Sequence, residues 1–250
     1  MQTDATLEQV KILAKQLKVP TFAQYPDLIR QMGGNADFGN LLLSLMENEY
    51  EQRQENQNRR RLKQAGLPYT KTLEELDLSR YNGNITDIFV NELASCRFIR
   101  EKKNLVMLGN PGRGKTHMAI GLALKACSMG MSVLFKNASS LSTELMEARD
   151  AYVLGKLERR IQRADLLVLD EMGYVSFDRF QSELLFKVIA DRSERGSIIV
   201  TTNLPFSEWT TLFENTAMVA AMVDRLTFQS YILDMNGKSY RLEQAKKQKR

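Results

Sequence analysis

The sequence predicts an α/β fold, in which a parallel sheet is flanked by helices and preceded by a small helical domain. Three observations support this class. Short apolar runs alternate with longer amphipathic helical patterns between residues 79 and 243, the order typical of parallel sheets. A glycine-rich loop at residues 109–116 joins one apolar run to the next helical pattern. Before residue 20, apolar residues follow helical spacing, at positions 7, 10, 13, 14 and 17.

The glycine-rich loop is the most specific motif of the chain. It fits G-x-x-x-x-G-K-[S/T], the pattern of a phosphate-binding loop between a strand and a helix. Its backbone N–H groups can converge on a polyphosphate, and the following helix adds the positive end of its dipole. Lys115 would reach the β- and γ-phosphates, and the Thr116 hydroxyl would ligate magnesium. The residues expected to bind the nucleotide are Gly109, Asn110, Pro111, Gly112, Arg113, Gly114, Lys115, Thr116 and His117.

An acidic pair, Asp170 and Glu171, ends a second apolar run. In a parallel sheet this position lies at the carboxyl edge, where ligands bind, and we expect Asp170 beside the phosphate loop. Asp170 can hold magnesium through water, and Glu171 can orient or deprotonate an attacking water. The alternative is a strand end whose two acids are simply solvated.

Asn203 follows a third apolar run, at residues 198–200. At the tip of that strand it can hydrogen-bond the attacking water or the γ-phosphate, or it can be an ordinary capping residue. His117, the single histidine, directly follows the loop and is equally compatible with a helix position that does no catalytic work.

The composition is that of a globular chain of 250 residues, with 43% hydrophobic and 26% charged residues. A net charge of +5 favours an anionic partner without identifying one. Cys96 and Cys127 lie in helical patterns and are expected to be reduced packing residues of a cytoplasmic protein. No apolar run approaches the roughly 18 residues of a membrane span, and no secretion signal is visible.

A polar and basic stretch separates the helical residues from the α/β part. Residues 51–61 contain no apolar side chain and no proline or glycine, which indicates a long helix solvated on every side. Such a helix can be a bare surface element or a basic arm that touches DNA phosphates without choosing a sequence. The candidate phosphate contacts are Arg53, Arg59, Arg60, Arg61 and Lys63.

The predicted organisation follows these changes in character. A helical domain with its basic arm occupies residues 1–66, a linker 67–78, the α/β domain 79–243 and a basic tail 244–250. Residues 231–233 and 239–242 are expected to pair as a hairpin around Asn236 and Gly237.

Several motifs together resemble the AAA+ ATPases: the phosphate loop, Asp170-Glu171, Thr202-Asn203 and the box Asp224-Arg225-Leu226. More specific stretches resemble the IstB family, the helper ATPases of insertion-sequence transposition, which are related to the DnaC-type helicase loaders. These stretches are residues 61–63 with 71–74, 114–117, 169–174 and 191–197. The likeness covers nearly the whole chain.

The resemblance implies ATP hydrolysis between subunits with Mg²⁺, oligomerisation on double-stranded DNA bound without sequence preference, and a transposase partner. It makes Asn203 the first sensor and Arg225 the arginine that reaches a neighbour's γ-phosphate, with Arg192 as a second candidate. AAA+ proteins commonly carry a C-terminal helical lid, and we expect this chain to lack one.

Three alternatives stay open at this point. A helicase loader would use the same ATPase core and bind a helicase through its N-terminal segment. A small-molecule kinase would need a lid bearing arginines and an acceptor pocket, which nothing between Gly173 and Asn203 suggests. An ATP-binding scaffold without turnover would not need Glu171.

Overall fold

The computed structural model describes residues 2–31, 38–81 and 85–236, and the chain divides into two compact units, residues 1–60 and 61–250. The sequence 239–242 and the basic tail at 244–250 lie outside the described residues. Within the described residues, no helix has both the length and the apolar character needed to cross a membrane.

The first unit consists of α1 (Gln2–Gln16), a 3₁₀ turn (Pro20–Gln24), α2 (Tyr25–Gln31) and the first part of α3 (Phe38–Ala65). The buried carboxylate of Glu49 on α3 accepts hydrogen bonds from Thr21 Oγ1 and Arg53 Nε, both at 2.7 Å. Arg53 Nη2 also donates to the carbonyl of Lys18 at 2.8 Å. These bonds hold α3 against the segment that follows α1. The polar stretch 51–61 is helical throughout, as predicted.

The second unit is built on a sheet of five strands: β1 (Asn104–Leu108), β2 (Val133–Asn137), β3 (Leu166–Asp170), β4 (Ser197–Thr202) and β5 (Ser230–Asp234). Their order is β2-β3-β4-β1-β5, and every pairing is parallel, which confirms the predicted fold class. β5 contains the first half of the expected hairpin and pairs in parallel with β1, whereas the second half lies outside the described residues.

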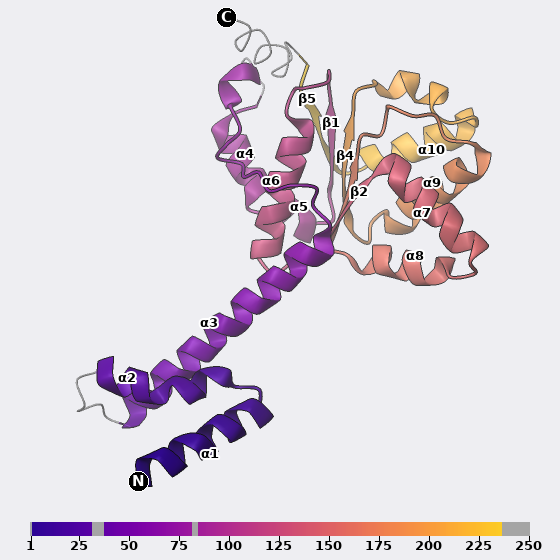
Figure 1. Cartoon of the computed structure of the whole chain (residues 1–250). Helices are drawn as coiled ribbons and strands as arrows, with labels where there is room; N and C mark the ends of the chain where they lie inside the picture. Colours follow the sequence, from indigo (N-terminus) through magenta and orange to yellow (C-terminus); the bar gives the residue numbers. More distant parts are fainter. Residues whose placement is uncertain (1, 32–37, 82–84, 237–250) are drawn as a thin grey trace, which may run out of the picture. The chain divides into compact units, whose positions relative to one another are not determined.

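Helices cover both faces of this sheet (Figure 1). One face carries α4 (Asp87–Ala94), α5 (Arg97–Arg100) and α6 (Lys115–Ser128); the other carries α7 (Ala138–Asp150), α8 (Leu154–Arg163), α9 (Arg179–Arg192) and α10 (Thr216–Thr227). Successive strand residues serve opposite faces: Leu105 and Met107 belong to one core cluster, and Val106 belongs to the other. Burial on both faces explains why the strand sequences are continuous apolar runs.

Residues 67–78 pack against the core of the second unit, to which they belong. Leu67, Leu73, Leu76 and Leu78 lie against the core cluster that contains the buried side of α6. Gly121 of α6 makes this approach possible, because a Cβ there would lie 2.6 Å from a Leu73 methyl carbon. A 3₁₀ turn (Leu78–Tyr81) follows and ends in a buried tyrosine. The packing brings this segment alongside the first turns of α6.

Arg192, at the end of α9, is 1% exposed and holds several elements together. Its Nη1 donates to the carbonyls of Ile161 and Ala164 at 2.6 and 2.9 Å, and its Nη2 to those of Ser197 and Asp165 at 2.9 and 3.3 Å. Burial lowers the pKa of Arg192 to about 10, and the nearby Asp165 raises it. The guanidinium therefore supplies hydrogen bonds to main-chain carbonyl groups where α8 ends and where β3 and β4 begin.

Replacing Arg192 by leucine should destabilise the second unit. The substitution leaves buried carbonyls without a donor, and each such group costs about 1–3 kcal/mol. We expect the free energy of unfolding, measured by urea denaturation, to fall by about 3 kcal/mol or more. Arg195→Leu, at an exposed position three residues away, is the matched control. Equal stability of Arg192→Leu and the wild type would contradict the assigned role.

Candidate functional site

The phosphate loop follows β1 and lies at the carboxyl edge of the sheet. Its first residue, Gly109, donates its N–H to the carbonyl of Thr202 at the end of β4, at 3.1 Å. Gly114, with φ 85°, is the N-cap residue of α6 and has no side chain that could cap the helix. The N–H groups of the first turn of α6 are therefore left for a ligand. The buried ammonium group of Lys115 donates to the carbonyls of Gly109 and Asn110. The loop is thus curled around a positive charge.

Arg113 holds the loop from behind. Its Nε donates to the carbonyl of Met235 at 3.0 Å and its Nη2 to that of Asn236 at 3.1 Å, beyond β5. Its guanidinium lies over the ring of Tyr81, 5.0 Å from the centroid, and the Tyr81 hydroxyl donates to the Arg113 carbonyl at 2.5 Å. Asn236 also accepts the N–H of Asn110 at 3.1 Å. The buried side chain of Arg113 is therefore held between the segment after β5 and the Tyr81 ring, beside the cleft that Arg113 and Tyr81 both line.

Asp170 ends β3 in a buried position and accepts two hydroxyl hydrogen bonds on one carboxylate oxygen. Thr116 Oγ1 donates to Oδ1 at 3.0 Å from the start of α6, and Thr201 Oγ1 donates to the same atom at 2.5 Å from β4. Burial raises the pKa of Asp170, and these two hydrogen bonds lower it. The carboxylate therefore connects three elements of the carboxyl edge.

Glu171 is held at both ends. Its φ of 60° lies in the left-handed region that residues other than glycine rarely adopt. Its backbone N–H donates to Thr201 Oγ1 at 2.9 Å, and its Oε2 accepts from Asn137 Nδ2 at 2.7 Å. Asn137 ends β2 and also caps α7, since its Oδ1 accepts the N–H groups of Ser139 and Ser140. Asn137 of β2, the neighbour of β3 on the side opposite to β4, thus fixes the orientation of the Glu171 carboxylate.

Thr201 and Asn137 were missed by the sequence analysis. Asp170 lies within hydrogen-bond distance of Thr116 at the end of the loop, although β4 separates its strand, β3, from β1. Thr201 of β4 fills that interval. Both residues could have been found from the sequence, because each is a polar side chain at the end of an apolar run, where the strands of a parallel sheet bind ligands. Asn137 is also paired in register with Asp170.

Asn203 lies just past β4 and packs against the turn that follows Glu171. Its Oδ1 is buried and has no hydrogen-bond partner among the described residues. Gly173 makes room for it, because a Cβ at Gly173 would lie 2.3 Å from that oxygen. Asn203 is therefore close to the acidic pair, while Thr201 and Thr202 line the adjoining cleft.

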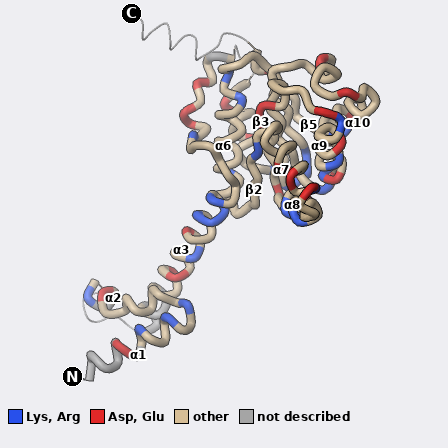
Figure 2. The backbone as a smooth tube through the Cα atoms, turned by 45° about the vertical axis from the view of Figure 1, so that its right-hand side comes forward, with Lys and Arg blue, Asp and Glu red and all other residues tan. Residues whose placement is uncertain are grey.

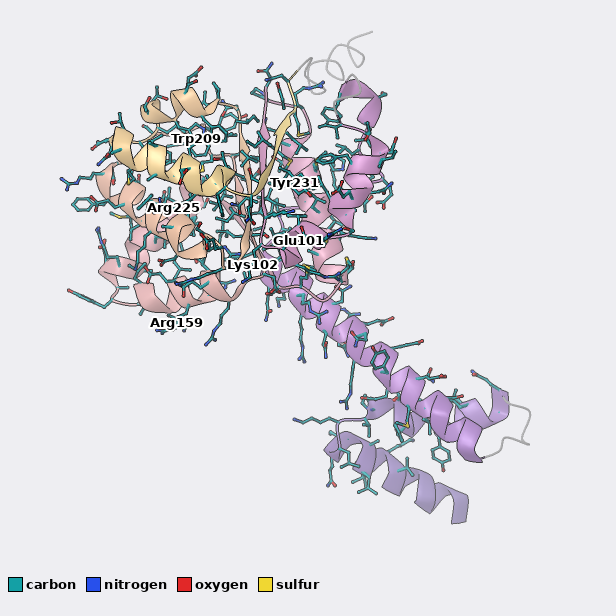
Figure 3. The ribbon with its side chains drawn as sticks, turned by 180° about the vertical axis from the view of Figure 1, so that it is seen from behind. Glu101, Lys102, Arg159, Trp209, Arg225 and Tyr231 are labelled. Carbon is teal, nitrogen blue, oxygen red and sulfur yellow. The ribbon has the colours of Figure 1, made fainter. Side chains whose placement is uncertain are left out.

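Arg225 lies away from the loop of its own chain. It occupies the last turn of α10, where its Nη1 donates to the Ala221 carbonyl at 2.9 Å and its guanidinium lies 5.3 Å from the ring centroid of Phe186 (Figure 3). Asn104, the first residue of β1, donates to the Arg225 carbonyl at 3.2 Å. Because the phosphate loop follows the last residue of β1, Arg225 and the loop lie at opposite edges of the sheet.

The remaining candidates have distinct surroundings. His117 Nε2 lies 2.7 Å from the Thr72 carbonyl, so its ring is engaged by the segment packed on α6. Arg59, Arg60 and Lys63 are exposed, and Arg61 is half-buried. Arg53 is engaged with Glu49 and Lys18, as described above.

A cleft of about 300 Å³ opens in front of the loop. Residues 112–117 form one wall, residues of the 69–81 segment such as Tyr69 and Lys71 form another, and Glu171 and Thr201 contribute polar groups between them. Among the described residues, no cluster of three or more His, Cys, Asp or Glu side chains could hold a metal ion by itself. The Thr116 hydroxyl and the Asp170 carboxylate, 3.0 Å apart, fit Mg²⁺ when phosphate and water supply its other ligands.

The chain matches the family model described as IstB-like ATP binding protein over residues 12–248. It is 33% identical to the insertion sequence IS21 putative ATP-binding protein of Pseudomonas aeruginosa, over 96% of this chain and 91% of that protein. It is 32% identical to the IS5376 putative ATP-binding protein of Geobacillus stearothermophilus, over 96% of each chain.

Solved structures show the same fold. DnaI matches with a TM-score of 0.55 at 19% identity, over 68% of this chain and 89% of that chain. The DnaC helicase loader matches with a TM-score of 0.50 at 22% identity, over 68% and 96%. AMPPCP-bound DnaA from Aquifex aeolicus matches with a TM-score of 0.59 at 17% identity, over 74% and 55%. With this AAA+ architecture and the sequence matches over nearly its whole length, the chain belongs to the IstB family of insertion-sequence ATP-binding proteins.

Proposed function

We propose that this protein hydrolyses ATP between copies of itself assembled on duplex DNA, and that it thereby assists a transposase. The observation that carries the catalytic part is the hydrogen-bond chain from Thr116 through Asp170 and Thr201 to Glu171. It connects the phosphate loop to a carboxylate held in a strained, directed position. A protein that merely bound ATP would have no need to orient Glu171.

Each residue of the cleft has a distinct task in this proposal. Lys115 exchanges its loop carbonyls for the β- and γ-phosphates, while the loop N–H groups bind phosphate oxygens. Thr116 and Asp170 hold Mg²⁺, which supplies positive charge to the phosphates when bound. Glu171 orients the attacking water and accepts its proton. Asn203, just past β4, would hydrogen-bond that water or the γ-phosphate through its side-chain amide.

The active site is completed by a second subunit. Phosphoryl transfer is accelerated by an arginine on the γ-phosphate, and Arg225 lies at the wrong edge of the sheet to serve its own loop. A neighbouring copy can present it instead. Arg192 is a poor candidate for that task, since its guanidinium is buried and bound to four carbonyls of its own chain.

DNA binding is proposed from charge and from the family. The exposed residues Arg59, Arg60 and Lys63, with Arg61, carry positive charge along α3 without apolar neighbours between residues 51 and 61. Such cations contact phosphates of any sequence. The relatives at 32–33% identity are proteins of insertion sequences, which favours a transposase partner over a helicase. DnaC and DnaI share the fold at lower identity.

Glu171→Gln should keep ATP bound and stop its turnover. The amide retains the shape of the carboxylate but cannot accept a proton, and a general base is worth about 10²–10⁴-fold in rate. Phosphate release and ATP binding measured on the same preparation separate the two steps. Lys115→Ala is the comparison variant, because it should lose ATP binding itself. Wild-type turnover by Glu171→Gln would refute the assignment.

Thr201→Val should lower kcat and leave the KM for ATP nearly unchanged. Valine fills the same space but can neither donate to Asp170 nor accept from Glu171. A hydrogen bond to a charged group is worth about 1.5–3 kcal/mol, so we expect a loss of about 10- to 100-fold. Thr201→Ser retains the hydroxyl and should recover most of the rate. Equal loss in the valine and serine variants would mean that the residue only fills space.

Arg225→Ala subunits should be rescued by mixing with Lys115→Ala subunits. Each variant alone should be nearly inactive, because an arginine on the γ-phosphate is worth about 10³–10⁵-fold in rate. A mixed assembly contains some interfaces with both an intact loop and an intact Arg225. ATPase activity on DNA, with mixed oligomers verified by differential tags, is the measurement. Mixed oligomers as inactive as their parts would show that Arg225 does not act across subunits.

A further inference from the structure

Helix α8 separates its apolar and basic residues sharply. Leu157 and Ile161 are buried against the sheet side, and the opposite face carries Lys156, Arg159, Arg160 and Arg163. All four basic side chains are exposed, and Figure 2 shows blue Lys and Arg positions on α8, interrupted by residues of other colours. Arg159 extends outward from α8 (Figure 3). At about 1.5 Å per residue, positions 156 to 163 form a row about 10 Å long, which spans roughly three phosphates of one DNA strand.

Within the part of the chain that the structure describes, no carboxylate compensates these four charges. None of the four forms a salt bridge with a described residue, and the carboxylate on the same helix, Glu158, pairs with Lys187 of α9. Several basic residues elsewhere on the second unit are paired: Arg97 and Lys103 with Glu101, Arg149 with Asp150, and Arg179 with Glu183. Unpaired, exposed cations in one row form a site for a polyanion rather than an internally neutralised surface.

A groove continues from this face. Its volume is about 320 Å³, and it follows the edge strand β2 at residues 134–137. Arg160 of α8 lies on one side, and residues 64–66 with Pro68 lie on the other. Lys63, which is exposed, directly precedes that second side. The end of α3 and the basic face of α8 thus flank the same groove within the second unit.

We propose that the basic face of α8, together with this groove, binds the phosphate backbone of duplex DNA. The inference rests on the proposed DNA binding, and it identifies the surface of the second unit that contacts the DNA. A single strand would be held by several stacked aromatic rings along its path. In the groove the aromatic ring is that of Phe135, which is buried, and the exposed ring of Tyr152 precedes the helix. Cations without a stacking path favour a duplex.

The test compares two full-length variants, each with four positive charges removed. One carries Lys156→Gln, Arg159→Gln, Arg160→Gln and Arg163→Gln; the matched control carries Arg97→Gln, Lys103→Gln, Arg149→Gln and Arg179→Gln. Fluorescence anisotropy with a labelled duplex of mixed sequence gives Kd over a series of salt concentrations. Removing one cation that neutralises a DNA phosphate flattens the slope of log affinity against log salt by about 0.9.

For the α8 variant we expect a slope flatter by about 3 and an affinity at least about tenfold weaker at 0.1 M salt. The control should stay within about one slope unit of the wild type, and ATP affinity without DNA should be unchanged in both. Should the fourfold α8 variant fail to fold, the pair Arg159→Gln and Arg163→Gln should give about half the effect.

Four results would overturn the assignment. A wild-type slope in the α8 variant refutes this surface, while DNA binding by the wild type leaves the proposed function standing. An equal loss in the control shows a general charge effect. Tighter, α8-dependent binding of a single strand shows that the ligand is not duplex. A wild-type protein that binds no duplex would remove the proposed DNA binding and this surface together.

Discussion

The carboxylate of Asp170 is the point on which the candidate site depends. One buried oxygen accepts hydrogen bonds from the hydroxyl groups of Thr116, at the start of α6, and of Thr201 in β4. Because the Thr201 hydroxyl also accepts the backbone N–H of Glu171, this oxygen links the phosphate loop to Glu171. A buried carboxylate without such donors would favour its protonated form, and a protonated Asp170 would be a poor partner for a cation. The hydroxyls of Thr116 and Thr201 oppose this effect of burial. The position and the charge of Asp170, and with them the proposed metal binding, therefore depend on the same pair of hydrogen bonds.

The strand order gives the two edges of the sheet different tasks. At the carboxyl edge the ends of β1, β3 and β4 bring the loop, the acidic pair and Thr201 together, and β2 adds Asn137. At the amino edge lie the beginning of β1 and, beside it, Arg225. A chain built this way separates its phosphate-binding residues from the arginine that would act on phosphate. In the proposed assembly a neighbouring copy would supply the arginine, which is the physical basis for proposing that hydrolysis occurs between subunits.

The loop is also supported by residues remote in sequence. Arg113 and Asn110 contact the chain just after β5, and Tyr81 contacts Arg113 from the segment before α4. These contacts restrict the conformations of the loop, and two of the residues that make them, Tyr81 and Arg113, also line the cleft. Ligand-binding loops that are ordered in advance lose less conformational entropy on binding. The same segment before α4 contributes a wall of the cleft.

The sequence by itself determined the fold class, the phosphate loop, the acidic pair and the family. These features are local: a glycine spacing, an apolar run of five residues or a polar strand end can be recognised within a short window. Tertiary structure alone decided which strand lies next to which. It therefore revealed Thr201 between the loop and Asp170, Asn137 on Glu171, and the inward direction of Arg113. It also assigned Arg192 to the interior, where its charge is used on carbonyls of its own chain. Most of these roles depend on contacts between residues 27 to 122 positions apart, which no local pattern encodes.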